Sequence, residues 1–168
     1  MSIPFQISAL PAEQFWPMFD MSKEQLVQRG AKRCIADAKP GYPCRVSLED
    51  AEIGEALILL PFVHHAVDSP YRASGPVFVR VGARQAQIGV SEVPDSVRRR
   101  LLSVRAYDAD GFLVDAEVTE GKNLEAIIER LFADSQIASL HLHNARPGCY
   151  NCRVDRAGNP VFHVEQSL

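Results

Sequence analysis

The sequence predicts an α+β protein with a mainly antiparallel sheet and helices packed on it. Strand-like segments outnumber helical ones, several of them are joined by tight turns, and strict strand–helix–strand alternation is absent. The last observation argues against a doubly wound nucleotide-binding fold. With 168 residues, of which 46% are hydrophobic and 23% charged, the chain is long enough for one buried core. We therefore expect one globular domain over residues 1–168.

The first part of the chain predicts two strands and two short helices. Residues 3–9 alternate apolar and polar side chains, as a strand does. Pro11 then begins a short helix, because a proline at the first helical position loses no hydrogen bond. Ser22 and Gln25 have the spacing of a capping box that starts the second helix. Residues 32–38 predict the next strand.

The middle of the chain predicts two more strands around a polar loop. Residues 56–63 are almost wholly apolar and are expected to form a strand buried on both faces. Pro61 donates no hydrogen bond, so the strand should be bulged, bent or at an edge there. Residues 77–81 alternate again, and the polar stretch 64–72 between the two strands is expected to be a loop of the kind that often carries function.

A hairpin and a helix follow. Residues 101–107 and 112–118 predict two strands joined by Asp108–Gly111, a sequence with strong turn chemistry. Asn123 is expected to cap the next helix. Apolar side chains of residues 124–132 fall on a single helical stripe, which we expect to lie on the sheet.

The last segments predict a strand and a second hairpin. Residues 137–144 form a strand in which His141 and His143 share one face, while the leucines between them take the core face. The histidine face is therefore expected to lie away from the core. Residues 153–156 and 161–164, joined by a Gly-Asn-Pro turn, predict the final hairpin.

The net charge and the N-terminal sequence indicate which cellular compartment and which classes of partner to expect. The net charge is −3, so we expect no nucleic-acid surface, and the basic run Arg98–Arg100 reads as a solvated helix face. The first residues resemble no signal peptide, and no apolar run approaches the length of about 20 residues that a membrane helix needs. We expect a cytoplasmic protein with reduced cysteines and no membrane partner.

Cys149 and Cys152 have a spacing that could supply half of a zinc site. Cys34, Cys44 or one of the histidines would have to complete it, because the chain has no second CxxC or CxxH. A redox pair is disfavoured, since no helix is predicted to follow the motif and activate a thiol. We therefore expect no metal and no cofactor.

A thiol, an imidazole and an amide also lie close together near the end of the chain. Cys149, His143 and Asn144 are the components of cysteine nucleophile chemistry, in which a base activates the thiol and an amide orients the base. Such sets are recognised by geometry, however, and the alternative is that Cys149 is a small buried residue in a turn.

Arginines beside predicted turns suggest a third chemistry. Arg45 follows the turn Pro40–Cys44, and Arg72 follows Tyr71 in the polar loop. A guanidinium held by a rigid turn can grip a carboxylate or phosphate at two points. The alternative for each arginine is a surface salt bridge with a nearby acidic residue.

Several long strings of residues make the chain similar to the bacterial domain-of-unknown-function family 1203. The similarity extends over nearly the whole length and is carried by Pro40–Ala51, Gly54–Glu55, Asp68–Arg72, Phe78–Arg80, Ala106–Gly111, His143–Ala145 and Gly148–Tyr150. The resemblance implies no activity, because the family has no assigned reaction. It does imply that Cys44 and Cys149 fit the family pattern. Cys152 departs from it, which weakens a zinc site through the CxxC pair.

The sequence thus favours a domain that binds a small polar or anionic ligand in one pocket. The residues expected to line it are Cys44, Arg45, Tyr71, Arg72, His143, Asn144, Cys149 and Tyr150. The alternatives are a thiol-dependent enzyme that uses Cys149 with His143, and a structural zinc or protein-interaction module. The sequence determines neither the ligand nor the oligomeric state.

Overall fold

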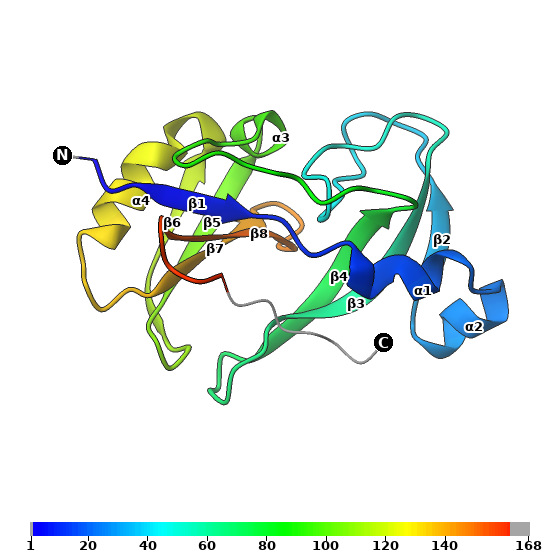
Figure 1. The fold of residues 1–168 in the computed structure, drawn as a ribbon, viewed down its shortest axis with the longest axis horizontal. Coiled ribbons are helices and arrows are strands. Elements are labelled where there is room, and N and C mark those ends of the chain that lie inside the picture. Colours follow the sequence, from blue (N-terminus) through cyan, green and yellow to red (C-terminus); the bar gives the residue numbers. More distant parts are fainter. Residues whose placement is uncertain (1, 162–168) are drawn as a thin grey trace.

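The structure, a computed structural model, describes residues 2–161 and has the predicted α+β architecture, built on two antiparallel sheets (Figure 1). The larger sheet has five strands in the order β1-β8-β7-β5-β6. These strands are β1 (Phe5–Ser8), β5 (Leu101–Tyr107), β6 (Leu113–Glu120), β7 (Ser139–Asn144) and β8 (Tyr150–Arg156). The smaller sheet contains β2 (Lys32–Ile35), β3 (Ala56–His65) and β4 (Ala73–Arg80), with β3 in the centre.

The helices are short. They are the 3₁₀ turns η1 (Glu13–Phe15) and η2 (Gly121–Asn123) and the α-helices α1 (Trp16–Phe19), α2 (Lys23–Gln28), α3 (Asp95–Arg98) and α4 (Leu124–Phe132). The capping box predicted at Ser22 and Gln25 is present. The cap predicted at Asn123 is wrong in its chemistry: Asn123 precedes α4 but its side chain makes no capping bond. Because η2 leads directly into α4, the backbone there is already helical when α4 begins.

One face of the five-stranded sheet forms the larger hydrophobic core with α4. Leu124, Ile128, Leu131 and Phe132 are buried against Leu102, Val104, Leu140 and Leu142 of the central strands. The apolar stripe of α4 therefore lies on the sheet as predicted, at the end of the molecule marked by α4 in Figure 1.

The smaller sheet differs from the prediction at its centre. β3 extends to His65, so the expected loop over residues 64–72 begins two residues later than predicted, and His64 and His65 belong to the strand. Pairing with β4 extends to His65, with a register shift between Val63 and His65 that leaves His64 without a directly paired residue. The strand was expected to be bulged, bent or at an edge at Pro61. β2 pairs with β3 only as far as Leu59, so β3 is locally an edge at Pro61, which among the described strands pairs with β4 alone.

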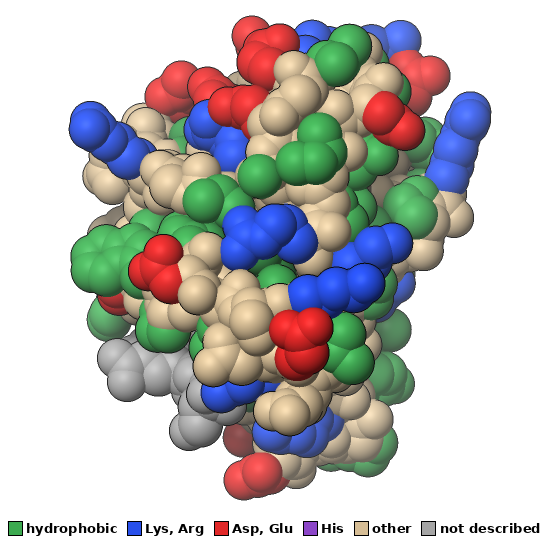
Figure 2. All heavy atoms as spheres, turned by 90° about the vertical axis from the view of Figure 1, so that its right-hand side faces the viewer, with side chains coloured by type: hydrophobic (Ala, Val, Ile, Leu, Met, Phe, Trp, Pro, Cys, Tyr) green, Lys and Arg blue, Asp and Glu red, His purple; other side chains and the backbone are tan. Residues whose placement is uncertain are grey.

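The two sheets meet along β3, β7 and β8. His64 of β3 stacks on Tyr150 of β8 with ring centroids 5.3 Å apart, and it meets the ring of His143 of β7 at 5.0 Å. Every residue of β7 is buried. The expectation that His141 and His143 lie on a face away from the core is therefore wrong, because the second sheet covers that face. In the part of the chain described, no histidine is visible on the face formed by the α1, α2 and β2 end of the molecule (Figure 2).

The C-terminal hairpin differs as well. Residues 153–156 belong to β8, which pairs antiparallel with β7 and with β1. The expected second strand, residues 161–164, lies almost entirely outside the described residues. Within residues 2–161, no helix is long and apolar enough to cross a membrane.

Candidate functional site

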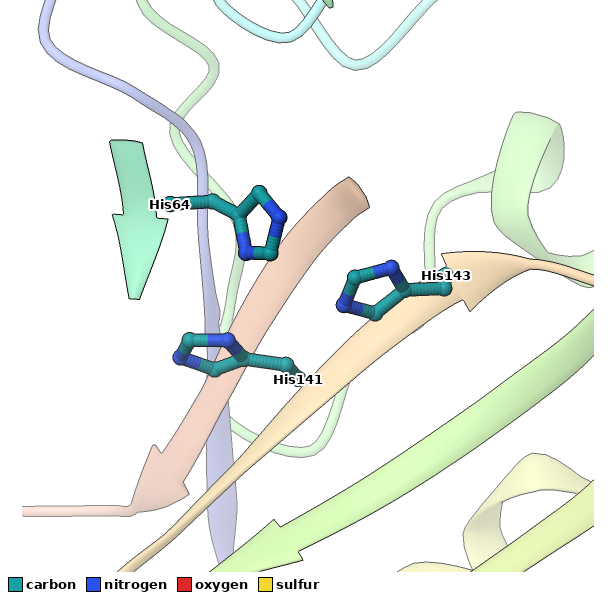
Figure 3. Close-up of side chains that lie close together, drawn as sticks. All are labelled: His64, His141 and His143. Atoms are coloured by element: carbon teal, nitrogen blue, oxygen red, sulfur yellow. The ribbon is translucent and has the colours of Figure 1, made fainter. Parts of the chain in front are cut away.

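Three histidines from two sheets meet in the interior. His64 extends from β3, and His141 and His143 extend from the same face of β7, so that the three rings point toward one another (Figure 3). Each ring offers one nitrogen, and these nitrogens all lie within 4.8 Å of one another. We call these residues the histidine cluster. Among residues 2–161 it is the one group of three or more His, Cys, Asp or Glu side chains with metal-binding proximity.

Each ring of the cluster has one nitrogen that lacks a hydrogen-bond partner within the described residues. Nδ1 of His64, Nδ1 of His141 and Nε2 of His143 are buried and unpaired. The other nitrogen of His143, Nδ1, lies 2.9 Å from the carbonyl oxygen of Gly148. A carbonyl oxygen only accepts, so Nδ1 carries the proton and Nε2 of a neutral His143 presents a lone pair to the cluster.

Burial favours the neutral form of all three rings. Removal from water lowers the pKa of His64 and of His143 to about 4, and the nearby Arg105 guanidinium adds to both shifts. Burial also lowers the pKa of His141 well below the ordinary value, with smaller contributions from His65 and Arg153. The cluster therefore consists of neutral imidazoles with unpaired nitrogens, an arrangement that costs folding energy unless something binds there.

Aromatic rings and a cavity surround the histidine cluster. Tyr150 stacks on His64, and Tyr107 meets the ring of His141 edge-on at 5.1 Å. A cavity of about 440 Å³ borders His64 and His141 and continues between the sheets toward the carboxylate of Asp155. That carboxylate is held by the guanidinium of Arg153 through bonds of 2.8 to 3.0 Å.

A second site lies around Arg45, which is 1% exposed. Its Nε donates to the carbonyl oxygen of Tyr150 at 2.7 Å, Nη1 donates to the carbonyl oxygen of Pro43, and Nη2 lies 3.2 Å from Sγ of Cys149. No carboxylate within residues 2–161 pairs with it. Burial lowers the pKa of the Arg45 guanidinium, and the neighbouring Cys149 sulfur opposes that shift.

Arg45 borders a pocket of about 630 Å³ that we call the arginine pocket. Among residues 2–161, four arginines and no acidic residue line it; this lining consists of Gly41, Pro43, Arg45, Leu59, Pro76, Phe78, Arg99, Arg100, Leu101, Asn144, Ala145, Arg146, Pro147 and Cys149. The charge of Arg100 is partly neutralised, because its guanidinium pairs with the buried carboxylate of Asp50. The pocket therefore carries excess positive charge next to apolar walls.

The structure brings together part of the predicted pocket. Arg45, Asn144 and Cys149 line the arginine pocket, and Nδ2 of Asn144 lies 3.8 Å from Sγ of Cys149. Tyr150 contributes its carbonyl oxygen to Arg45, while its buried ring faces the histidine cluster. Cys44 supports the turn, since its buried Sγ accepts hydrogen bonds from two backbone N–H groups, those of Ser47 and Arg80.

Other predicted residues lie elsewhere or face another way. Tyr71 and Arg72 do not line the arginine pocket; Tyr71 instead contacts Tyr107 and Phe112 near the β5–β6 turn. His143 has one ring nitrogen on Gly148 and the other in the histidine cluster, and no hydrogen bond joins it to Cys149 within the described residues.

The thiols of the CxxC motif lie in different surroundings. Cys149 borders the arginine pocket, whereas Cys152 is part of the hydrophobic core beneath α4. Burial raises the pKa of the Cys152 thiol to about 12. All four cysteines of the chain are free. A metal site built on both thiols of the motif has no support in this arrangement.

Sequence reasoning missed His64 and three of the pocket arginines. The sequence predicts a loop at His64, and the register shift between Val63 and His65 means that no regular strand pattern marks the extension of β3. The run Arg98–Arg100 read as one solvated face, whereas Arg99 and Arg100 turn to the pocket and Arg98 pairs with Glu125. Arg146 gave no signal apart from its place in the turn before Cys149.

These features define a two-sheet α+β protein with a histidine cluster between the sheets and an arginine pocket beside it. Comparison with known families matches residues 41–156, well over half of the chain, to the family described as "Protein of unknown function (DUF1203)". The chain belongs to this family, as the resemblance in its sequence indicated. No curated protein and no solved structure matches it.

Proposed function

We propose that this protein binds a small anionic molecule, a carboxylate or a phosphate, in the arginine pocket. The observation that carries the proposal is the buried guanidinium of Arg45, which no carboxylate of the described residues neutralises. A buried charge without a partner is costly, and proteins commonly compensate such a charge with a counterion. A bound anion supplies that counterion.

Arg45 has donors to spare for a ligand. A guanidinium carries five N–H groups. Three of its donor contacts go to Tyr150, Pro43 and Cys149, one from each nitrogen. Two N–H groups of the guanidinium, one on each terminal nitrogen, therefore remain without a protein acceptor among the described residues. Because Arg45 borders the pocket, these donors are suited to the two-point grip of a carboxylate or phosphate.

The rest of the pocket narrows the ligand class. Arg99 and Arg146 are exposed and carry no ion pair within residues 2–161, so they add positive charge at the mouth. Leu59, Pro76 and Phe78 contribute apolar surface to the same pocket. A ligand with one anionic group and a compact apolar body matches both surfaces, since the apolar part gains from burial and the charge from the arginines.

Titration calorimetry with inorganic phosphate and with phenyl phosphate tests the proposal. We expect phenyl phosphate to bind more tightly than phosphate, phenol not to bind, and both affinities to fall as salt rises. Arg99→Ala removes one exposed charge and should weaken phenyl phosphate binding by about 1 kcal/mol, or roughly fivefold.

Arg98→Ala is the matched control, because Arg98 is the preceding residue but pairs with Glu125 and does not line the pocket. It should leave the affinity unchanged. Binding that is absent, or that falls equally in the two variants, contradicts an arginine pocket specific for anions.

A thiol-dependent reaction is the second candidate, and one contact favours it. Nη2 of Arg45 lies 3.2 Å from Sγ of Cys149, which places a guanidinium donor directly on the thiol that borders the pocket. In this version Arg45, and not His143, would activate the thiol. Slow alkylation of Cys149 by iodoacetamide, at the rate of an unactivated thiol, would exclude it.

A further inference from the structure

The histidine cluster combines proximity with unmet bonding capacity. Three imidazole nitrogens, one from each ring and drawn from two separate sheets, lie within 4.8 Å of one another. Each of the three rings also has one buried nitrogen without a hydrogen-bond partner in the described chain, namely Nδ1 of His64, Nδ1 of His141 and Nε2 of His143. A single unpaired nitrogen is an ordinary imperfection. Three in rings that converge on one point indicate a missing common partner.

We propose that the histidine cluster is a binding site for a divalent transition-metal ion of the zinc type. Neutral imidazole nitrogens are preferred ligands of zinc, which they hold at about 2.0–2.1 Å. In a tetrahedral site that length places the ligand nitrogens about 3.4 Å apart. The nitrogens now lie within 4.8 Å of one another, so binding requires them to move closer together, and His64 approaches from the opposite sheet (Figure 3).

The surroundings of the cluster resemble those of metal-binding histidines in general. A ligating histidine usually donates its second ring N–H to a carbonyl or carboxylate, which fixes the ring and directs the free lone pair at the ion. Nδ1 of His143 makes this bond to the carbonyl oxygen of Gly148 at 2.9 Å. The turn that ends at Gly148 thereby orients His143 toward the cluster.

Three protein ligands leave one coordination position open. Structural zinc sites are usually closed by four protein ligands, whereas reactive sites keep a position for water or substrate. His64 and His141 border the cavity of about 440 Å³ between the sheets. The fourth position therefore faces a space large enough for water or a small molecule, and the site belongs to the open type.

The positive charge of Arg105 should weaken binding of the metal ion. Arg105 lies opposite His141 in the pairing of β5 with β7, which places a positively charged residue beside the cluster. A neighbouring cation repels a divalent ion, so removal of this charge should tighten binding. Arg153 also faces His141, but Asp155 neutralises it.

The test is a zinc titration of chelator-stripped full-length protein against a chromophoric competitor. We expect one Zn²⁺ per chain. His64→Gln, His141→Gln and His143→Gln should each weaken binding by at least about 100-fold, since even loss of a residue that supports a ligand costs 10–100-fold. Arg105→Gln should strengthen it severalfold.

His65→Gln is the matched control. His65 is the next residue of the same strand, but its Nε2 is bonded to the carbonyl oxygen of Gly111 and it is not one of the three ligands. It should bind zinc like the natural chain. Circular dichroism identifies variants that fail to fold, and those are set aside.

Cobalt provides a readout that needs no variant. Co²⁺ bound by three imidazoles should give the visible bands of a four- or five-coordinate ion without the intense near-ultraviolet band of a thiolate ligand. No binding, a thiolate band, or equal loss in the His65 and His64 variants would each overturn the proposal.

Discussion

The histidine cluster and the arginine pocket adjoin the same short segment, residues 143–149, yet their chemistry is opposite. The cluster presents neutral rings with lone pairs, and the pocket presents fixed positive charge with no acid in its lining. Gly148 orients His143 on one side, while the next residue, Cys149, contacts Arg45 on the other. One turn thus supports two sites that suit a cation and an anion respectively.

The comparison shows how burial acts on different groups. A guanidinium keeps its charge when buried, so Arg45 needs acceptors and finds two carbonyl oxygens and a sulfur. An imidazole loses its charge instead, as the lowered pKa values of His64 and His143 indicate. Its free nitrogen is then available to bind a metal ion. The same desolvation therefore leaves a charged donor at Arg45 and neutral nitrogens at the histidines, which is the physical basis of the proposed anion and metal sites.

The largest effect should come from Arg45→Met. The substitution removes the guanidinium and leaves the carbonyl oxygens of Tyr150 and Pro43 buried without their donor. We expect a loss of about 3–5 kcal/mol in the free energy of unfolding, measured by denaturant titration. Arg146→Met, at an exposed arginine of the same pocket, should change stability by less than about 0.5 kcal/mol. Equal effects of the two would mean that Arg45 is not the structural centre of the pocket.

A smaller effect of opposite sign is expected at His141. Its buried Nδ1 has no partner in the described structure, so His141→Leu removes an unsatisfied polar atom and retains an apolar side chain of similar bulk. In protein stripped of metal we expect a gain of about 1–2 kcal/mol in unfolding free energy, together with loss of zinc binding. A clear loss of stability without metal would show that His141 serves packing and not a ligand.

The smallest expected effect is a difference in alkylation between the two thiols of the CxxC motif. Only a thiolate is alkylated, and burial raises the pKa of Cys152 to about 12. Below its unfolded pKa of 9, Cys152 is therefore protonated in both states, and any stability it contributes declines as pH rises from 9 toward 12. Mass spectrometry after iodoacetamide treatment of native protein at pH 8 should find Cys149 labelled and Cys152 protected. Equal labelling would place Cys152 outside the core.

Much of the fold could be predicted from local pattern. The stripe of α4, the β5–β6 hairpin and the capping box at Ser22 depend on residues close in sequence, and the structure contains all three. The pairing of β8 with β1 joins residues about 150 apart, and no local pattern specifies it. For the same reason the burial of the histidine face of β7 could not be foreseen, because the covering strand belongs to the other sheet.

Part of the candidate site could also be predicted, and the difference between local sequence pattern and long-range strand pairing explains which part. Arg45 was selected because it follows a rigid turn, and Asn144 and Cys149 because an amide and a thiol near His143 could act together; these three residues do meet in one pocket. Arg72, with Tyr71, was selected like Arg45 for its place beside a turn, but their loop lies at the other end of β3. Whether loops that are distant in sequence lie on the same side of the molecule depends on the sheet topology, which local sequence does not encode.

The most direct test of two separate sites with opposite ligands measures both ligands on the same two variants. Zinc and phenyl phosphate are titrated into the natural chain, His64→Gln and Arg99→Ala. We predict that His64→Gln loses zinc and keeps phenyl phosphate, whereas Arg99→Ala weakens phenyl phosphate and keeps zinc. A variant that weakens both ligands, or two variants that weaken neither, would contradict the account.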